Sequence, residues 1–340
     1  MKGFPHPATQ LTQLRCTTAA LLFFFAFWIA RLPAQCTGKE GLAALPSTRL
    51  NVLVSSRIFS VANRNDVVAA MKIWGDQTGC LSHLNVNSVV DVAETQSDLR
   101  RRLLNASADV LVLDNMEFVR LEDAGLVDGI AVASSSGHPF AFSYLLLVNE
   151  QTTSLAQLRA KRAIFYLHTS SAASAAWIAT LLAHDHLGRL ETFFGPSQVS
   201  NKPSNCFLPV FFNRAEACVL DSRDWEMAKE MNPQIGKKLR VLAESTPVLD
   251  GVTAMRKGPL VERQKLIDAI LSSHKYPAGE QILAVFKSGP LIPYKAEFLD
   301  STRTFWNEYA LTLTAAERAE WIETGKDVLP KQFLRPSGME

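Results

Sequence analysis

Residues 164–177 read IFYLHTSSAASAAW, and this stretch joins two kinds of local structure. The apolar run IFYL is typical of a buried strand, and the alanine-rich segment that follows is typical of a helix. Between them stand three hydroxyl residues, Thr169, Ser170 and Ser171. Such side chains cap the first N–H groups of a helix, but a helix N-terminus with free hydroxyls also suits an anion. Both interpretations of the hydroxyls stay open from this stretch alone.

Upstream of this stretch, strands and helices alternate. Residues 49–55 (RLNVLVS) are apolar enough for a strand buried on both faces, and residues 108–113 (ADVLVL) are also expected as a strand. The spacing of apolar residues predicts a third strand and three helices in the same region: strand 84–92, and helices 65–75, 94–104 and 116–124. Alternation of this kind predicts a parallel sheet covered by helices.

The alternation restarts downstream and then gives way to helices. Strands are expected at 142–148, at IFYL, at 217–220 and, as the last strand, at 239–243, with a helix over 172–184. Beyond residue 243 the pattern is mostly helical, with helices predicted over 260–273, 280–286, 298–310 and 315–324. The predicted fold class is therefore α/β, with two units in series and a C-terminal helical tail.

The first 34 residues have the features of a signal peptide. Lys2, Arg15 and Arg31 flank the apolar run TAALLFFFAFWIA, and no acidic residue occurs among them. The run is short for a membrane span, and the small residue Ala34 suits cleavage, so residues 1–34 are expected to direct export to the periplasm. An uncut membrane anchor is the alternative.

Without this leader the chain is close to neutral. The whole chain has 35 basic and 33 acidic residues, and the leader removes three basic ones. This balance gives no basic patch of the kind that binds nucleic acid, so no nucleic-acid partner is expected.

Four cysteines remain after export, Cys36, Cys80, Cys206 and Cys218. An oxidising compartment allows three pairings of them. Closeness in sequence favours Cys206 with Cys218, which would leave Cys36 for Cys80, although buried thiols are equally compatible with the sequence. No CxxC motif occurs, so a zinc or redox site finds no support.

The sequence offers no readable catalytic machinery. GxSxG, GxGxxG, the P-loop and HExxH are all missing. His184 and His186 flank Asp185, but neighbours on a helix point in different directions and are poorly placed to share a metal. The sequence therefore predicts no enzyme activity, no metal and no cofactor.

Polar residues recur at the carboxyl ends of the predicted strands, where open parallel sheets bind ligands. These candidate ligand-binding residues are Ser55, Ser56, Asp114, Asn115, Thr169, Ser170, Ser171 and Asp221. Each alone is an ordinary cap or loop residue. Their division between two units that can face each other predicts a binding cleft.

Three segments resemble the phosphate/phosphite/phosphonate-binding family of type II periplasmic solute-binding proteins. They are SLAQLRAKRAIFYLHTSSAAS (154–174), VFFNRAEACVLDSRDWEMAKEMNPQIGKKLRVLAES (210–245) and ADVLVLDN (108–115). The NPQIGKKLRVL part is the most specific, and together with the intervening sequence the resemblance spans about residues 49–293. The helical tail after Leu311 lies outside it.

The resemblance implies two α/β lobes joined by two crossing strands, which would lie at 142–148 and 239–245. Lobe 1 would comprise residues 35–141 and 246–340, and lobe 2 residues 142–245. Thr169, Ser170 and Ser171 would hold the oxyanion, and Asp221 would face a polar or cationic tail of the ligand. This chain departs from the family pattern at Ala172, where a glycine is usual, and in SSRIFS, which lacks a tyrosine.

The expected function is that of an exported, monomeric solute-binding protein that captures a small phosphorus oxyanion for an ABC transporter permease. A periplasmic sensing module for a membrane signalling partner is a second possibility, as is a binder of another ligand such as a thiamine precursor or a sulfonate. A phosphate-ester hydrolase would need a nucleophile or metal cluster that the sequence does not provide.

Overall fold

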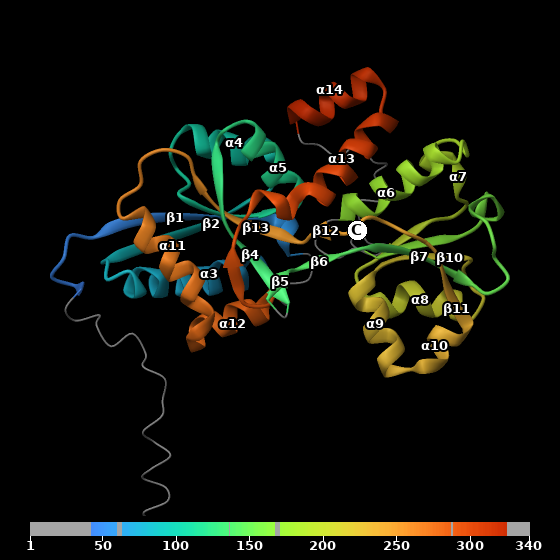
Figure 1. The fold of residues 1–340 in the computed structure, drawn as a ribbon, viewed down its shortest axis with the longest axis horizontal. Coiled ribbons are helices and arrows are strands. Elements are labelled where there is room, and N and C mark those ends of the chain that lie inside the picture. Colours follow the sequence, from blue (N-terminus) through green and yellow to red (C-terminus); the bar gives the residue numbers. More distant parts are fainter. Residues whose placement is uncertain (1–41, 60–62, 136, 167–170, 287, 325–340) are drawn as a thin grey trace, which may run out of the picture.

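The computed structural model describes residues 42–324 except 60–62, 136, 167–170 and 287. Two separate β-sheets lie side by side, each covered by helices on both faces (Figure 1). The N-terminal leader, Cys36, and the residues Thr169 and Ser170 lie outside the described residues.

The first sheet has the order β14-β4-β13-β3-β1-β2, with β5 paired to β4. Its strands are β1 (Thr48–Ser55), β2 (Val86–Ala93), β3 (Val110–Asp114), β4 (Val127–Ser135), β5 (His138–Pro139), β13 (Gly251–Arg256) and β14 (Leu291–Pro293). β1 runs parallel to β2 and β3, whereas β13 runs antiparallel to both β3 and β4.

Two groups of helices cover the two faces of this sheet (Figure 1). On one face Leu99 of α4 (Gln96–Leu104) and Phe118 of α5 (Asn115–Asp123) join a buried cluster with Val252 of β13. On the other face Trp74 of α3 (Arg64–Leu81) packs with Met255 of β13. This second face is also covered by α11 (Arg263–Ser272) and α12 (Pro277–Val285). The alternation of Val252 and Met255 between faces follows from the twofold period of a strand.

The second sheet has the order β11-β7-β10-β8-β9. Its strands are β7 (Tyr144–Asn149), β8 (Ala163–Tyr166), β9 (Gln198–Ser200), β10 (Ala217–Asp221) and β11 (Leu239–Glu244). One face is covered by α6 (Ser171–His184) and α7 (Leu190–Phe193), and the other by α8 (Pro203–Phe211), α9 (Ser222–Met231) and α10 (Pro233–Lys238). Short 3-10 helices complete the chain: η2 (Ser56–Ile58), η3 (Leu155–Leu158), η4 (Ser273–Lys275) and η5 (Ala296–Leu299).

Two differences from the sequence-based expectation concern strands. The segment after residue 243 contains β12 (Val248–Leu249), β13 and β14, so 239–243 is not the last strand. The first sheet is also mixed rather than parallel, because β13 runs antiparallel to both of its neighbours, β3 and β4. Both β4 (VDGIAVASS) and β13 (GVTAMR) are rich in small residues, so their hydrophobic pattern is weak.

The crossing segments also differ from the expectation. Strands β7 and β11 both belong entirely to the second sheet, where they pair antiparallel to each other. The chain instead passes between the sheets through β6 (Ala141–Phe142) and β12, which form a two-stranded antiparallel pair. The crossings expected at 142–148 and 239–245 therefore lie a few residues closer to the first sheet.

The last two helices contact both halves of the molecule. Arg303 of α13 (Asp300–Thr312) pairs with Glu122 and Asp123 of α5, beside the first sheet. The same helix packs Phe305 and Tyr309 into the buried cluster that contains α6. Helix α14 (Ala315–Thr324) is held to the second half by the Arg189–Glu317 ion pair at 2.8 Å.

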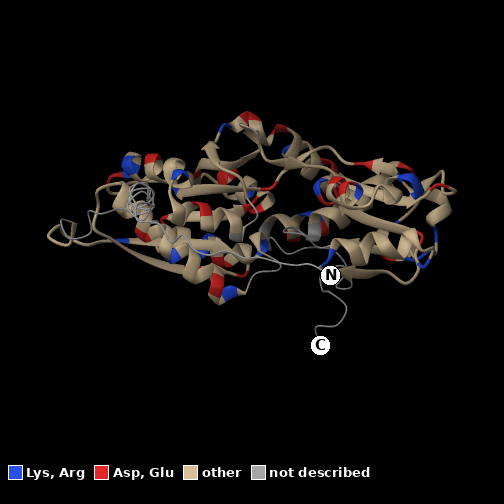
Figure 2. Cartoon of the chain, turned by 90° about the horizontal axis from the view of Figure 1, so that it is seen from below, with Lys and Arg blue, Asp and Glu red and all other residues tan. Residues whose placement is uncertain are grey.

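A disulfide joins Cys206 of α8 to Cys218 of β10, which confirms the pairing favoured by sequence. Cys80 is also disulfide-bonded, and the pairing predicted for it with Cys36 involves a residue outside the described part of the chain. Basic and acidic residues are interspersed over both halves (Figure 2). None of the helices within the described ranges is both long and apolar enough to cross a bilayer.

Candidate functional site

Polar residues from both sheets converge where the two halves of the molecule meet. Ser55 ends β1 and Asp114 ends β3 in the first sheet, and Asp221 ends β10 in the second. Tyr144, at the start of β7, is influenced by the two carboxylates. Burial first, and then the charge of Asp221, raise the pKa of Tyr144, and the charges of Asp250 and Asp114 act in the same direction, whereas Arg223 lowers it. Carboxylates from both halves therefore act electrostatically on one buried phenol.

On the first side of this junction, Asp114 and Glu117 form a capping box around the start of α5. The backbone N–H of Glu117 donates to Asp114 Oδ1 at 2.7 Å, and the N–H of Asp114 donates to Glu117 Oε2 at 3.3 Å. Both side chains are buried, at 0% and 1% exposure. Arg57 lies opposite them, with Nε 3.6 Å from Glu117 Oε1 and Nη1 3.9 Å from Asp114 Oδ2.

The charge balance of this group is unusual. Burial, and next the neighbouring charge of Asp114, raise the pKa of Glu117 to about 8, against the opposing effect of Arg57. Burial and the like charge of Asp114 therefore favour the protonated form of Glu117 in the folded protein.

On the second side, Arg223 in the first turn of α9 connects the two halves. Its Nη2 lies 3.3 Å from Asp221 Oδ2, and its Nη1 lies 3.7 Å from Asp250 Oδ2, in the segment between β12 and β13. The guanidinium also stacks over Phe142 and Phe140, with its carbon 4.1 and 4.8 Å from the ring centroids. Arg223 thus joins the second sheet to the crossing segments by charge and by stacking.

Asp224 and Tyr166 extend this group away from the crossing. Burial, and next the charge of Asp221, raise the pKa of Asp224 to about 6. Tyr166, at the end of β8, hydrogen-bonds Asp224, and its pKa is raised chiefly by burial. Through Tyr166, this group includes the last residue of β8, the strand that precedes the hydroxyl segment in the sequence.

The predicted site residues have different surroundings. Ser55 is buried and accepts a hydrogen bond from the N–H of Arg57, and Ser56 begins η2. Asn115 has both polar side-chain atoms engaged: Nδ2 donates to the carbonyl of Leu249, and Oδ1 accepts from Trp306 Nε1. Asn115 therefore anchors α5 to the crossing segment and to α13.

In the second half, Asp221 is the N-cap of α9 and accepts from the N–H of Asp224 at 2.9 Å, besides pairing with Arg223. Thr169 and Ser170 lie outside the described residues, as does the side chain of Ser171. The backbone of Ser171 begins α6, a helix of 14 residues that follows β8 after a short connection.

Seven residues of this site were missed by sequence reasoning: Arg57, Glu117, Tyr144, Tyr166, Arg223, Asp224 and Asp250. Arg57 and Arg223 each lie two residues after a strand end, at Ser55 and Asp221. The strand-end rule used for the other candidates could therefore have found them. Asp250 follows the unpredicted strand β12, so its position carried no such signal.

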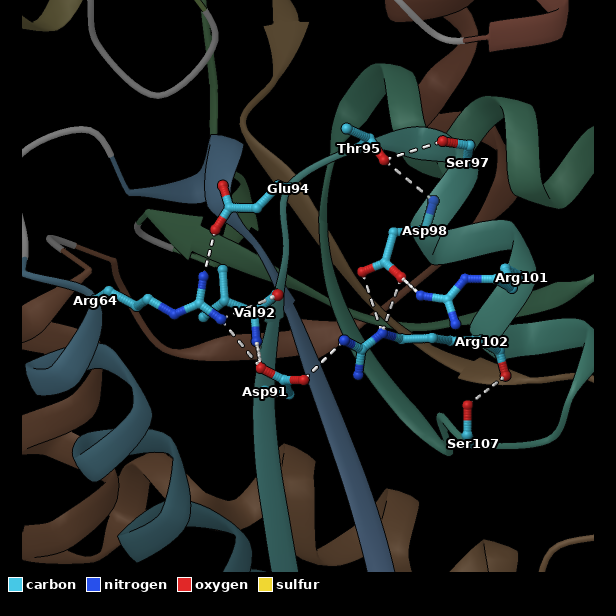
Figure 3. Close-up of polar contacts among 10 residues, drawn as sticks. All are labelled: Arg64, Asp91, Val92, Glu94, Thr95, Ser97, Asp98, Arg101, Arg102 and Ser107. Carbon is cyan, nitrogen blue, oxygen red and sulfur yellow. Dashed lines mark hydrogen bonds and ion pairs between the residues drawn. The ribbon is translucent and has the colours of Figure 1, made fainter.

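A second polar cluster lies at the end of β2. Asp91 accepts from Arg64 and Arg102, at 3.1 and 2.7 Å, and Asp98 pairs with Arg102 and Arg101 (Figure 3). Partial burial would raise the pKa of Asp91, but the Val92 N–H and Arg102 lower it. These charges satisfy one another and tie α3 and α4 to the sheet.

Metal binding finds no geometric support in residues 42–324 as far as they are described. No group of three or more His, Cys, Asp or Glu side chains there is arranged to hold a metal ion. His184 contacts Asp185 through Nδ1 at 3.0 Å at an exposed helix end.

The chain is similar to known proteins both in sequence and in fold. A sequence family described as "ABC transporter, phosphonate, periplasmic substrate-binding protein" matches residues 81–297. No curated protein is significantly similar in sequence.

Three solved structures share the fold at low sequence identity. The binding protein component of an ABC phosphonate transporter from Pseudomonas aeruginosa is 14% identical, with a TM-score of 0.52 over 82% of this chain and 94% of that one. PhnD1 from Prochlorococcus marinus, in complex with methylphosphonate, is 14% identical, with a TM-score of 0.51 over 76% and 97%. XAC2383 from Xanthomonas citri, bound to ATP, is 14% identical, with a TM-score of 0.57 over 78% and 98%. The likeness confirms the type II periplasmic-binding fold.

Proposed function

This chain belongs to the ABC transporter phosphonate periplasmic substrate-binding family, and we propose that it captures a small phosphorus oxyanion between its two lobes for delivery to an ABC transporter permease. As a member of this family it is a binding protein and not an enzyme. The oxyanion proposed is a phosphonate, phosphite or phosphate.

One observation carries the proposal: the family match over residues 81–297 includes the whole second sheet, every strand of the first sheet except β1, both crossing segments and the hydroxyl stretch between β8 and α6. The match therefore covers most of both lobes that a two-lobed binding protein needs to enclose a ligand. The ligands of two proteins of the same fold support the phosphorus oxyanion, because methylphosphonate and ATP both carry one.

In the proposed complex, the N-terminus of α6 binds the oxyanion. Its first-turn N–H groups have no partner within the helix and carry the positive end of the helix dipole. Thr169, Ser170 and Ser171 add hydroxyl donors next to them. Such donors to an anion contribute about 1.5–3 kcal/mol each.

The remainder of the ligand faces the charged groups at the lobe junction. Ser55 and Ser56 of lobe 1 are proposed to contact the ligand from the opposite side, and Asp114 and Asn115 to hold that edge in place. Asp221 is proposed to favour a cationic tail. Because Arg223 already neutralises Asp221 at 3.3 Å, such a tail has to compete with Arg223 or approach through Asp250.

The moving units are proposed to be residues 35–141 with 246–340 as lobe 1, and residues 142–245 as lobe 2. The protein is proposed to reach the periplasm by removal of residues 1–34 and to act as a monomer. Mass spectrometry of the exported protein tests the leader: a first residue near Gln35 supports cleavage, and an intact Met1 in the periplasmic fraction contradicts it.

A titration of the double variant S170A/S171A tests the anion site. We expect methylphosphonate or phosphate binding to weaken by about 2–5 kcal/mol, because two donors to a charged group are lost. Isothermal titration calorimetry measures the change. Asn232→Ala is the matched control, since it removes a helix cap from α10 in the same lobe, where Asn232 Oδ1 accepts from the N–H of Gln234.

N232A is expected to bind the anion as the unmodified protein does. Equal affinity of S170A/S171A and the unmodified protein, with both folded, would remove the hydroxyl stretch from the site. If N232A loses anion affinity to the same extent, the loss of a helix cap in this lobe is enough to weaken binding, and the hydroxyl stretch has no specific role.

A further inference from the structure

The first lobe contains a cavity of about 80 Å³ between its sheet and α12. It lies on the sheet face covered by α3, α11 and α12 (Figure 1). The lining is mainly apolar and includes Ile58, Trp74, Ala133, Leu283 and Phe286. Asp250, Thr253 and Ser288 are its polar members.

The cavity adjoins the lobe junction through two of its lining residues. Asp250 lines the cavity and also pairs with Arg223 of the second lobe at 3.7 Å. Ile58 lines it too and directly follows Arg57, which faces Asp114 and Glu117. The apolar cavity therefore lies next to the charged groups proposed to face the ligand.

Small residues on the sheet shape this space. Gly251 opens β13, and a Cβ placed on it would lie 2.8 Å from Ile58 Cδ1, so Ile58 rests directly on the backbone there and forms one wall. Ala133 of β4 lies further along the same face, opposite Leu291 of β14. A larger side chain at Ala133 would reduce the volume of the cavity.

The size and lining match a short hydrocarbon group. An engineered apolar cavity of about 150 Å³ binds benzene, so a volume about half as large suits a chain of about three carbons. Buried apolar groups gain about 0.8 kcal/mol for each methylene removed from water. Asp250, the charged member of the lining, lies on the side of the junction, where the chain would join its charged head.

We propose that this cavity receives an apolar alkyl substituent of the ligand, so that the preferred cargo is an alkylphosphonate with a chain of about three carbons. This inference rests on the proposed function, because the phosphonate group has to occupy the junction for its substituent to reach the cavity. Asp250 and Ile58 then form the entrance between the charged and apolar parts of the site.

Calorimetric titration with methyl-, ethyl-, propyl- and butylphosphonate tests the proposal. Affinity of the unmodified protein is expected to rise about fourfold per added methylene up to propylphosphonate. Ala133→Leu, which fills the cavity, is expected to keep methylphosphonate binding within twofold and to remove the gain with chain length. Leu283→Phe fills it from the α12 side and serves if A133L does not fold. Thr253→Val keeps the volume and is the matched control, with the gain retained.

The outcomes separate this inference from the function beneath it. Binding of methylphosphonate with flat or falling affinity for longer chains overturns the cavity proposal and leaves the proposed function in place. A gain with chain length that persists unchanged in folded A133L or L283F also overturns it, since the chain then binds elsewhere. Failure of every phosphonate and of phosphate to bind overturns the proposed function and, with it, this inference.

Discussion

Glu117 is the residue whose surroundings most clearly depart from those of an ordinary surface acid. Its side chain is 1% exposed, accepts from the N–H of Asp114 and lies 3.6 Å from Arg57. Burial, reinforced by the charge of Asp114, raises its pKa to about 8. The folded protein therefore keeps a proton on Glu117 at pH values where an unfolded chain has released it.

This difference makes stability depend on pH. Between the ordinary value of 4.5 and about 8 the folded state binds one proton more than the unfolded state at this position. The free energy of unfolding therefore falls as pH rises through that window. We expect Glu117→Gln to remove about 1–3 kcal/mol of that fall between pH 5 and pH 8.5.

Urea unfolding at both pH values measures the effect. Glu226→Gln changes a carboxylate that is 63% exposed and serves as the control, with an unchanged pH profile expected. If E117Q and the unmodified protein lose stability equally over this range, Glu117 is not protonated in the folded state.

For single residues, the sequence predicted where the site residues lie better than which groups they contact. The strand-end rule found Ser55, Asp114 and Asp221, and all three lie buried at the lobe junction. It could not show that Asp114 and Asp221 cap helices, because capping depends on where α5 and α9 begin. Nor could it assign partners such as Arg223 and Asp250, which are 27 residues apart and meet only in the folded chain.

Helices α13 and α14 are additions to the two lobes that the family match describes. They follow residue 297, where the family match ends. Trp321 of α14 is 7% exposed, packs with Tyr309 at a centroid distance of 5.7 Å and lies under the guanidinium of Arg120 at 4.0 Å. Through these contacts the buried side chain of Trp321 anchors α14 to α13 and to Arg120.

We expect Trp321→Ala to destabilise the protein by about 2–4 kcal/mol, because it leaves a cavity among α13, α14 and Arg120. Ile322→Ala, on the same helix and 63% exposed, is the matched control and should cost less than about 0.5 kcal/mol. Chemical denaturation of both variants gives the comparison. Equal stabilities for the two would mean that α14 does not pack as described.

Prediction of the elements succeeded where hydrophobic patterns are strong and failed where residues are small. The apolar runs that became β1, β3, β7 and β10 were all expected as strands. β13 was not, although it lies at the centre of the first sheet, because Gly251 and Ala254 contribute little apolar surface. Tertiary packing between β3 and β4 makes this segment a strand, and no local signal reports that packing.

Within the described residues, three connections built from helices and strands join the two halves, in addition to the Arg223–Asp250 pair, and the third was not predicted. Two are the crossing strands β6 and β12. The third is α13 with α14, which pair with α5 through Arg303 and with the second half through Arg189 and Glu317. Hydrogen bonds from Arg189 and Thr314 lower the pKa of Glu317 to about 2, so this link stays charged at every physiological pH. The lobe movement proposed for ligand capture therefore has to take place about all three connections.

A thermal-shift screen of residues 35–340 tests the central claim, that the protein binds a phosphorus oxyanion, most directly. The panel consists of phosphate, phosphite, methylphosphonate, propylphosphonate and 2-aminoethylphosphonate, with sulfate as the competing oxyanion. A ligand at 100 times its dissociation constant adds about 2.7 kcal/mol to the free energy of unfolding. The account predicts a shift of several degrees with at least one phosphorus compound and a smaller one with sulfate. Unchanged melting with every phosphorus compound at millimolar concentration would contradict it.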